Sequence, residues 1–271
     1  MSDLMVAAIQ TQSTDDVERN LDQALKLSNR AVEGGAQFLA LPENYAFLGS
    51  EVDKRALAKP LEGHPFLSPL QELAKKAGVW VLAGSVPEAS TDPDRPYNTS
   101  VVIGPEGALS SSYRKIHLFD IDIPDGVTYC ESAAVTPGDT TVLTTVGAFS
   151  VGLSVCYDLR FPELYRELVT KGAELLTVPA AFTLQTGKDH WDTLLRARAI
   201  ENQAYVIAPN QWGSHGRGRA SWGKTQIIDP WGTVLGLVGE EPGVCFARVS
   251  ADFLKRSRQN LPALTHRRLQ S

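Results

Sequence analysis

The alternation of short apolar runs with segments of helical periodicity, from one end of the chain to the other, is the feature that most constrains its fold. The first apolar run is LMVAAIQ at 4–10, and apolar residues at helical spacing follow over 17–31, before Gly34 and Gly35. Short apolar runs predict strands, and residues that recur every three or four positions predict helices with one buried face. The alternation therefore predicts an α/β protein whose helices cover the faces of its sheets.

The remaining expected elements follow the same rhythm without an internal repeat or a linker. Further strands are predicted over 36–43, 79–86, 99–104, 108–115, 149–157, 174–182, 204–211, 224–230 and 244–249. Further helices are predicted over 66–77, over 188–203 and from a start near Pro162, where proline suits a first turn. Because no composition shift divides the chain, we expect a single domain over residues 1–271. This pattern alone does not determine how the sheets stack.

The charge balance excludes several classes of partner. Lys and Arg number 26 against 31 Asp and Glu, a net charge of −5, which argues against nucleic acid as the main partner. No polybasic stretch suits an anionic membrane, no segment approaches the ~20 apolar residues of a membrane helix, and the N-terminus lacks a basic signal region. The cysteines Cys130, Cys156 and Cys245 are too few for a disulfide framework. We therefore expect a cytoplasmic protein with reduced thiols that binds neither nucleic acid nor membrane.

The segment 116–140 breaks the rhythm, because it has weak periodicity, two prolines and several acids. A connection this long inside a compact domain is usually functional or disordered. Loops carry a disproportionate share of binding and catalytic residues. We therefore expect this loop to contribute to a functional site.

Cys156 ends an apolar strand run and directly precedes YDLRFP. A nucleophile at a strand-to-helix turn is exposed at the edge of a sheet, and the backbone N–H groups after it point to where an oxyanion forms. The alternative is a small buried strand residue, since free cysteine is among the most buried residue types. Arg160, four residues further on, holds either a substrate carboxylate or a structural salt bridge.

Two more charged residues stand at the ends of predicted strands. Glu43 follows an apolar run in LPENY, and Lys115 closes another strand in YRKIH. Each is either a solvated strand-end residue or part of a site. Glu131, in YCES, lies in the long loop and has no local signature of its own.

Three other patterns are weak. His117 stands near Asp120 and Asp122, but no HExxH or paired-cysteine motif accompanies it, so a metal site is not expected. The segment 218–225 satisfies GxxxxGK[ST], but a polar stretch precedes it and a strand pattern follows, whereas a phosphate-binding loop needs a strand before it and a helix after it. Asn98 begins an NTS glycosylation pattern, which has no meaning in a cytoplasmic protein.

Taken together, these residues carry a family resemblance. LPEN around Glu43, YRKIHLFD around Lys115 and GLSVCYDLRFPELYREL around Cys156 resemble, in order and separation, the three signatures of the nitrilase superfamily of carbon–nitrogen hydrolases. YCESAAVTPGD fits the segment with the superfamily's second glutamate, which falls on Glu131. The resemblance covers nearly the whole chain. It implies an α/β fold of four α-β-β-α layers and subunits paired into homodimers or larger assemblies.

Four later segments are similar to the Nit branch of small amidases: HWDTLLRARAIENQAYV, GRASWGKTQIIDPWGTV, EEPGVCFARV and LPALTHRRL. This similarity implies hydrolysis of a small amide distal to an α-keto acid, with deaminated glutathione giving 2-oxoglutarate and cysteinylglycine. An omega-amidase acting on 2-oxoglutaramate and a true nitrilase remain alternatives. A nucleotide-binding protein that uses 218–225 and a catalytically idle binding protein are the alternatives from other classes.

The resemblance also implies a role for each motif residue. Cys156 is the nucleophile and forms a thioester, while Glu43 is the general base. Lys115 stabilises the oxyanion together with the backbone N–H of Tyr157. Glu131 orients Lys115 or assists the attacking water. No metal or organic cofactor is required.

Further side chains are expected to contact the substrate. Arg160 suits a substrate carboxylate, because its planar guanidinium binds such a group through two hydrogen bonds. Phe182 and Thr186 match the segment that lines the acyl pocket in related Nit enzymes. Tyr45 is expected as a further wall of the pocket, because it follows Glu43.

Overall fold

Two six-stranded β-sheets lie at the centre of the structure, a computed structural model that describes residues 3–122 and 129–269. In spatial order, the first sheet consists of β16 (Gly243–Val249), β1 (Leu4–Gln10), β2 (Phe38–Ala40), β3 (Trp80–Glu88), β4 (Tyr97–Ile103) and β5 (Leu109–Arg114). The second consists of β15 (Val234–Leu237), β14 (Gln226–Ile228), β11 (Tyr205–Ala208), β10 (Leu175–Thr177), β9 (Phe149–Leu153) and β8 (Leu143–Val146). Two short hairpins pair β12 (Trp212–Gly216) with β13 (Arg219–Trp222), and β6 (Asp120–Ile121) with β7 (Tyr129–Cys130).

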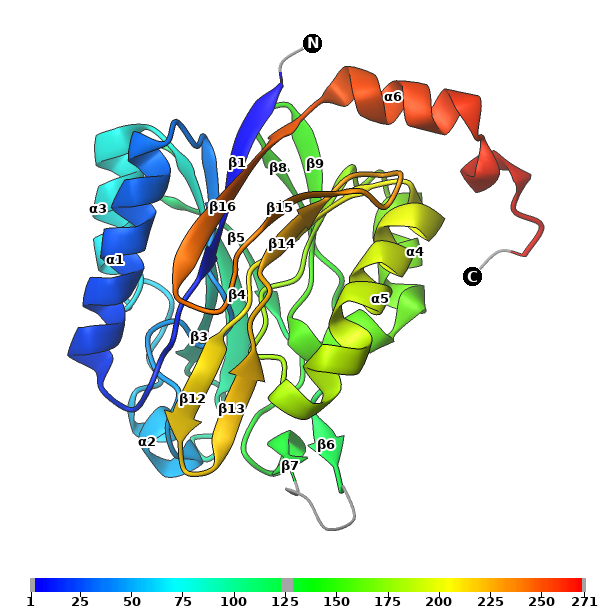
Figure 1. Cartoon of the computed structure of the whole chain (residues 1–271). Helices are drawn as coiled ribbons and strands as arrows, with labels where there is room; N and C mark the ends of the chain where they lie inside the picture. Colours follow the sequence, from blue (N-terminus) through cyan, green and yellow to red (C-terminus); the bar gives the residue numbers. More distant parts are fainter. Residues whose placement is uncertain (1–2, 123–128, 270–271) are drawn as a thin grey trace.

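Helices cover the outer face of each sheet. Figure 1 shows α1 (Val17–Glu33) and α3 (Ser68–Ala77) against the first sheet, and α4 (Pro162–Thr170) and α5 (Leu184–Asn202) on the opposite side of the molecule. The shorter elements are α2 (Glu51–Ala56), α6 (Ala251–Asn260) and the 3₁₀ helices η1 (Glu131–Ala133), η2 (Cys156–Arg160) and η3 (Ala263–His266). The layers therefore run helix, sheet, sheet, helix, which confirms the α-β-β-α sandwich.

The stacking explains why the first strand is apolar from Leu4 to Ile9. Alternate side chains of a strand point to opposite faces of its sheet. Val6 and Ala8 pack into the core between the two sheets, whereas Ala7 and Ile9 pack into the core beneath α1 and α3. Both faces are buried, so both sets of positions favour apolar side chains.

Several predicted strands are longer than the observed ones. The run 36–43 forms only β2, the run 174–182 forms only β10, and the run 149–157 leaves the second sheet after Leu153. The residues beyond these strand ends are apolar because they are buried, although they are not part of a sheet ladder. Helices α2 and α6 and strands β8, β12, β13 and β15 are elements that the sequence reading did not identify.

The nucleotide-binding alternative is wrong. Residues 218–225 contain β13 and lead into β14, so no helix follows the GxxxxGK[ST] pattern. In the described ranges, no group of three or more His, Cys, Asp or Glu side chains is arranged to hold a metal ion. No described helix has the length and apolar character to cross a membrane.

Gly84 lies in β3, at the irregularity in its pairing with β4, and approaches the chain that follows β2 just before Glu43. A Cβ atom added at this position would overlap the backbone carbonyl oxygen of Pro42. Because a backbone atom has no free space to move into, we expect Gly84→Ala to lower the free energy of unfolding by about 2 kcal/mol or more, as overpacked interiors do. Urea unfolding would measure this, with Gly239→Ala as the control, since a Cβ there meets nothing within 4 Å. An unchanged midpoint for Gly84→Ala would contradict the close approach.

Candidate active site

Residues that follow four different strands line one pocket. Glu43 comes after β2, Lys115 after β5, Cys156 after β9, and Ala181 and Phe182 after β10. The pocket has a cavity volume of about 200 Å³. Because β1, β2 and β3 are parallel, as are β9, β10 and β11, the carboxyl ends of each set meet at one edge of their sheet. The fold thus brings together the three residues that the sequence analysis placed at strand ends.

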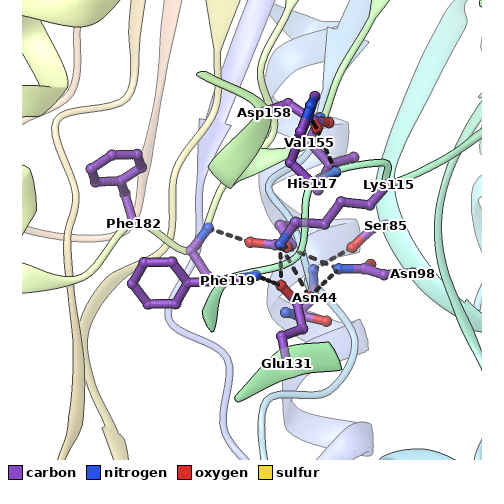
Figure 2. Close-up of polar contacts among 12 residues, drawn as sticks. Asn44, Ser85, Asn98, Lys115, His117, Phe119, Glu131, Val155, Asp158 and Phe182 are labelled. Carbon is purple, nitrogen blue, oxygen red and sulfur yellow. Dashed lines mark hydrogen bonds and ion pairs between the residues drawn. The ribbon is translucent and has the colours of Figure 1, made fainter. Parts of the chain in front are cut away.

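Lys115 occupies the centre of the polar contacts. Its Nζ lies 3.1 Å from Oε1 of Glu43 and 2.8 Å from Oε2 of Glu131, and its side chain is 2% exposed. Figure 2 shows the lysine reaching toward Glu131. Burial on its own lowers the pKa of a lysine, but the charges of Glu131 and Glu43 raise the pKa of Lys115 well above its ordinary value. The lysine therefore stays cationic.

Glu43 is held as a carboxylate. Its Oε1 also accepts a hydrogen bond from Asn98 Nδ2 at 2.9 Å, and its Oε2 accepts one from the backbone N–H of Ala181 at 2.9 Å. Burial raises the pKa of this carboxyl group, but the charges of Lys115 and Lys54 and the hydrogen bonds outweigh that effect. The pKa of Glu43 is therefore lower than usual, so the group is ready to accept a proton.

Cys156 begins η2 with a φ of +50°, a left-handed conformation that costs energy for a residue other than glycine. Its backbone N–H donates to the carbonyl of Pro179 at 2.9 Å, which fixes the turn. Burial and the neighbouring Glu43 raise the pKa of the thiol well above its ordinary value, although Lys115 opposes them. At rest the site therefore pairs a protonated thiol with a carboxylate base and a cation.

Glu131 reaches the site from the loop 116–140. Its Oε2 accepts a hydrogen bond from the backbone N–H of Phe119 at 2.7 Å, besides its contacts with Lys115. The described part of this loop thus contributes to the site, as expected. Residues 123–128 of the predicted loop lie outside the described residues.

The turn that presents Cys156 is anchored by Asp158, whose side chain is fully buried. Its Oδ2 accepts hydrogen bonds from Tyr113 Oη at 2.7 Å and from the backbone N–H of Val155 at 2.8 Å. Its Oδ1 accepts from the backbone N–H of His117 at 3.0 Å and lies 2.7 Å from His117 Nδ1 (Figure 2). His117 therefore helps to hold the turn that presents Cys156.

Asp158 and Asn98 are site residues that sequence reasoning missed. Asp158 stands two positions after Cys156 in the same signature, but nothing in the sequence reveals that it is buried and accepts several hydrogen bonds. In the sequence, Asn98 stands out only as the first residue of a glycosylation pattern. Its contact with Glu43 spans 55 positions along the chain, so no local pattern could have indicated it.

Most of the predicted substrate-binding residues line the pocket, namely Tyr157, Arg160, Phe182 and Thr186. Nη1 of Arg160 lies 3.3 Å from His190 Nδ1, and Thr186 Oγ1 lies 2.8 Å from Thr183 Oγ1. Arg160 forms no ion pair with a carboxylate in the described part of the chain, so the structural salt bridge considered for it is not present.

The prediction for Tyr45 is wrong. The chain passes through Asn44 with a φ of +57°, which sends the next side chain away from the pocket. Tyr45 is 0% exposed, packs in the core beneath α1 and α3, and donates a hydrogen bond to the carbonyl of Phe66 at 2.7 Å. Asn44 and Phe47 line the pocket in its place.

Comparisons with known proteins agree with this geometry. The family model described as "Carbon-nitrogen hydrolase" matches residues 5–259. The deaminated glutathione amidase of Synechocystis sp. is 46% identical over 98% of this chain and 99% of its own length. The deaminated glutathione amidase of Homo sapiens is 41% identical over 97% of this chain and 82% of its own length.

Solved structures share the fold. The Caenorhabditis elegans NitFhit protein superposes with a TM-score of 0.93 and 36% identity, covering 99% of this chain and 66% of that chain. Nit3 of Saccharomyces cerevisiae, a member of branch 10 of the nitrilase superfamily, has a TM-score of 0.89 and 29% identity, with 98% and 97% coverage. An amidase from Nesterenkonia sp. AN1 (TM-score 0.78, 30% identity, 96% and 98% coverage) shows addition of acrylamide at its active-site cysteine.

Asp158→Asn tests the anchoring of the turn. The amide of the variant would place an N–H donor against groups that now donate hydrogen bonds to the carboxylate. We therefore expect the free energy of unfolding to fall by about 2–4 kcal/mol. Chemical denaturation measures the change, and slower alkylation of Cys156 would accompany it. Asp192→Asn is the matched control, because that side chain is 59% exposed and its ion pair with Arg196 spans 3.9 Å. Equal stabilities of the two variants would refute the anchoring role.

Proposed function

The chain belongs to the carbon–nitrogen hydrolase family and is an amide-hydrolysing enzyme of the nitrilase superfamily; we propose that its substrate is deaminated glutathione and that Cys156 is its nucleophile. The observation that carries the proposal is the buried network in which Lys115 joins Glu43 and Glu131 beside the thiol. Relatives named deaminated glutathione amidase match nearly the whole chain, which supports the substrate.

The first half of the reaction forms a thioester. Cys156 Sγ attacks the carbonyl carbon of the scissile amide while its proton passes to the carboxylate of Glu43. The negative charge that develops on the carbonyl oxygen is stabilised by Lys115 and by the backbone N–H of Tyr157; removing one such donor typically costs about 3–4 kcal/mol of barrier height. Glu43 then returns the proton to the departing amine, and the carbon–nitrogen bond breaks.

The second half releases the acid. A water molecule loses a proton to Glu43 and attacks the thioester carbonyl, and the oxyanion forms again beside Lys115. Collapse of this intermediate breaks the carbon–sulfur bond and restores the thiol with the proton that Glu43 holds. Glu131 keeps Lys115 charged and in place throughout, because its two oxygens lie 3.0 and 2.8 Å from Nζ.

The acyl half of the substrate is a short α-keto acid. Arg160 binds its carboxylate, since the guanidinium lines the pocket and has no carboxylate partner among the described residues. Phe182 and Thr186 form the adjoining wall. Hydrolysis of deaminated glutathione then yields 2-oxoglutarate and cysteinylglycine.

We also propose that the enzyme works in the cytoplasm as a homodimer or a larger homo-oligomer, and that it binds neither nucleic acid nor membrane. The three cysteines are free, as a reducing compartment requires. The edge strand β15 exposes the apolar side chains of Leu235 and Leu237, beside exposed Trp231, and such surfaces favour association.

Turnover tests the substrate and the nucleophile together. We expect release of 2-oxoglutarate from deaminated glutathione to exceed that from 2-oxoglutaramate, and we expect Cys156→Ala and Glu43→Gln to lower kcat by at least about 1000-fold. Coupled detection of 2-oxoglutarate measures both. Glu62→Gln, an exposed glutamate outside the pocket, is the control that should keep full activity. Preference for 2-oxoglutaramate would make the enzyme an omega-amidase, and full activity of Cys156→Ala would exclude the mechanism.

The lowered pKa of Glu43 predicts the acid limb of the pH profile. The base must be ionised in the free enzyme, so kcat/KM should stay level as the pH falls from neutrality and decline only below 4.5, the ordinary value for glutamate. The same shift stabilises the fold above the pKa of the unfolded chain, and that contribution is lost as the pH falls through the pKa in the folded state. Circular dichroism at each pH separates unfolding from titration. A midpoint between about 5 and 6 would mean that burial outweighs Lys115.

A further inference from the structure

A second buried lysine lines the pocket and has no role in the mechanism above. Lys54 belongs to α2, its residue is 8% exposed, and it stands in the wall with Glu51 and Gly49. Across residues 3–122 and 129–269, no ion pair or hydrogen bond satisfies its ammonium group. Because Lys54 lines the pocket and its ammonium group has no carboxylate at ion-pair distance among the described residues, that group is available to an anion that enters the cavity.

Two other cations of the pocket, Lys115 and Arg219, have carboxylate partners within the chain. The ammonium group of Lys115 forms ion pairs with both Glu43 and Glu131. Arg219 of β13 donates to the carbonyl of Gly49 at 3.1 Å and lies 3.7 Å from the carboxylate of Glu51, and these contacts join the β12–β13 hairpin to the α2 wall. Figure 1 shows this hairpin and α2 at the same end of the molecule. Lys54 and Arg160 are thus the two pocket cations that have no carboxylate partner in the described chain.

These two cations lie on different walls. Arg160 extends from η2 beside α5, where its Nη1 approaches His190. Lys54 extends from α2, and its charge acts on Glu43. Glu43 is the group that protonates the departing amine in the proposed mechanism. We therefore expect the leaving group to pass beside Lys54, which lines the same pocket as Glu43.

We propose that Lys54 binds a carboxylate on the leaving group and so selects dianionic amides, with one carboxylate for Arg160 and one for Lys54. This inference rests on the proposed function and extends it to substrate choice. Deaminated glutathione carries both carboxylates, one on its α-keto acid and one on its terminal glycine. 2-Oxoglutaramate carries only the first, because its leaving group is ammonia. The charges of the pocket thus distinguish the two candidate substrates.

The test compares three substrates at pH 8, where Glu43 is ionised with or without Lys54: deaminated glutathione, its analogue with a terminal glycinamide, and 2-oxoglutaramate. With wild-type enzyme, the free carboxylate should raise kcat/KM over the glycinamide by about 10- to 100-fold, as one charge-assisted hydrogen bond does. With Lys54→Met this ratio should fall to about one, mainly through KM, while turnover of 2-oxoglutaramate changes by less than about threefold.

Two variants complete the comparison. Lys54→Arg keeps the charge and should restore part of the preference for the carboxylate. Lys59→Met is the matched control, because Lys59 is exposed just beyond α2 and does not line the pocket. An equal loss on all three substrates in Lys54→Met, or no carboxylate preference in the wild type, would overturn the inference.

Different results would contradict the proposed substrate and the proposed role of Lys54. If the wild-type enzyme turns over 2-oxoglutaramate but not deaminated glutathione, the proposed substrate is wrong. Inhibition of that remaining turnover by cysteinylglycine and by cysteinylglycinamide then tests Lys54 directly. Tighter inhibition by the free carboxylate, lost in Lys54→Met, supports the subsite, and equal inhibition excludes it.

Discussion

The buried charge of Lys115 is the interaction on which the rest of the site depends. An ammonium group that is 2% exposed stays charged only with close counter-charges, and Glu43 and Glu131 supply them from two different segments. The same contacts hold the pKa of Glu43 low and keep that carboxylate ionised beside the thiol. One ion network therefore sets the protonation state of the proposed base, positions the proposed oxyanion donor and joins Glu131 of the long loop to the residues at the strand ends.

The proposed nucleophile, Cys156, depends on a second constraint, the strained turn at the start of η2. A left-handed φ at Cys156 is tolerated because its surroundings determine it from several directions. Asp158 gathers donors from β5, from the segment after it and from the turn itself. Strain at Cys156 is thus offset by the hydrogen bonds of a buried carboxylate that does not line the pocket.

Charge also organises the pocket beyond the reacting atoms. The cations of Lys115 and Arg219 are compensated by glutamates, whereas Arg160 and Lys54 line the cavity from walls formed by different elements. Both walls come from short elements that follow strand ends, the turn at η2 and the helix α2. η2 carries both Cys156 and Arg160, so one short element serves the proposed chemistry and the binding of the acyl half, while α2 contributes Lys54.

The sequence by itself determined the α/β class, most strand and helix positions and the residues of the three signatures, because apolar periodicity and local motifs are properties of neighbouring residues. The four-layer stacking and the roles of Glu43, Lys115 and Cys156 came from the resemblance. Only the tertiary structure decided which other residues join them. The structure places Asn98 and Asp158 in hydrogen bonds at the site, Tyr45 in the core and Lys54 in the wall of the pocket. The physical reason is that burial depends on contacts between segments far apart in the sequence and on the direction of single backbone turns, such as the one at Asn44. Burial in turn determines the pKa and the hydrogen-bond partners of a charged or hydroxyl group.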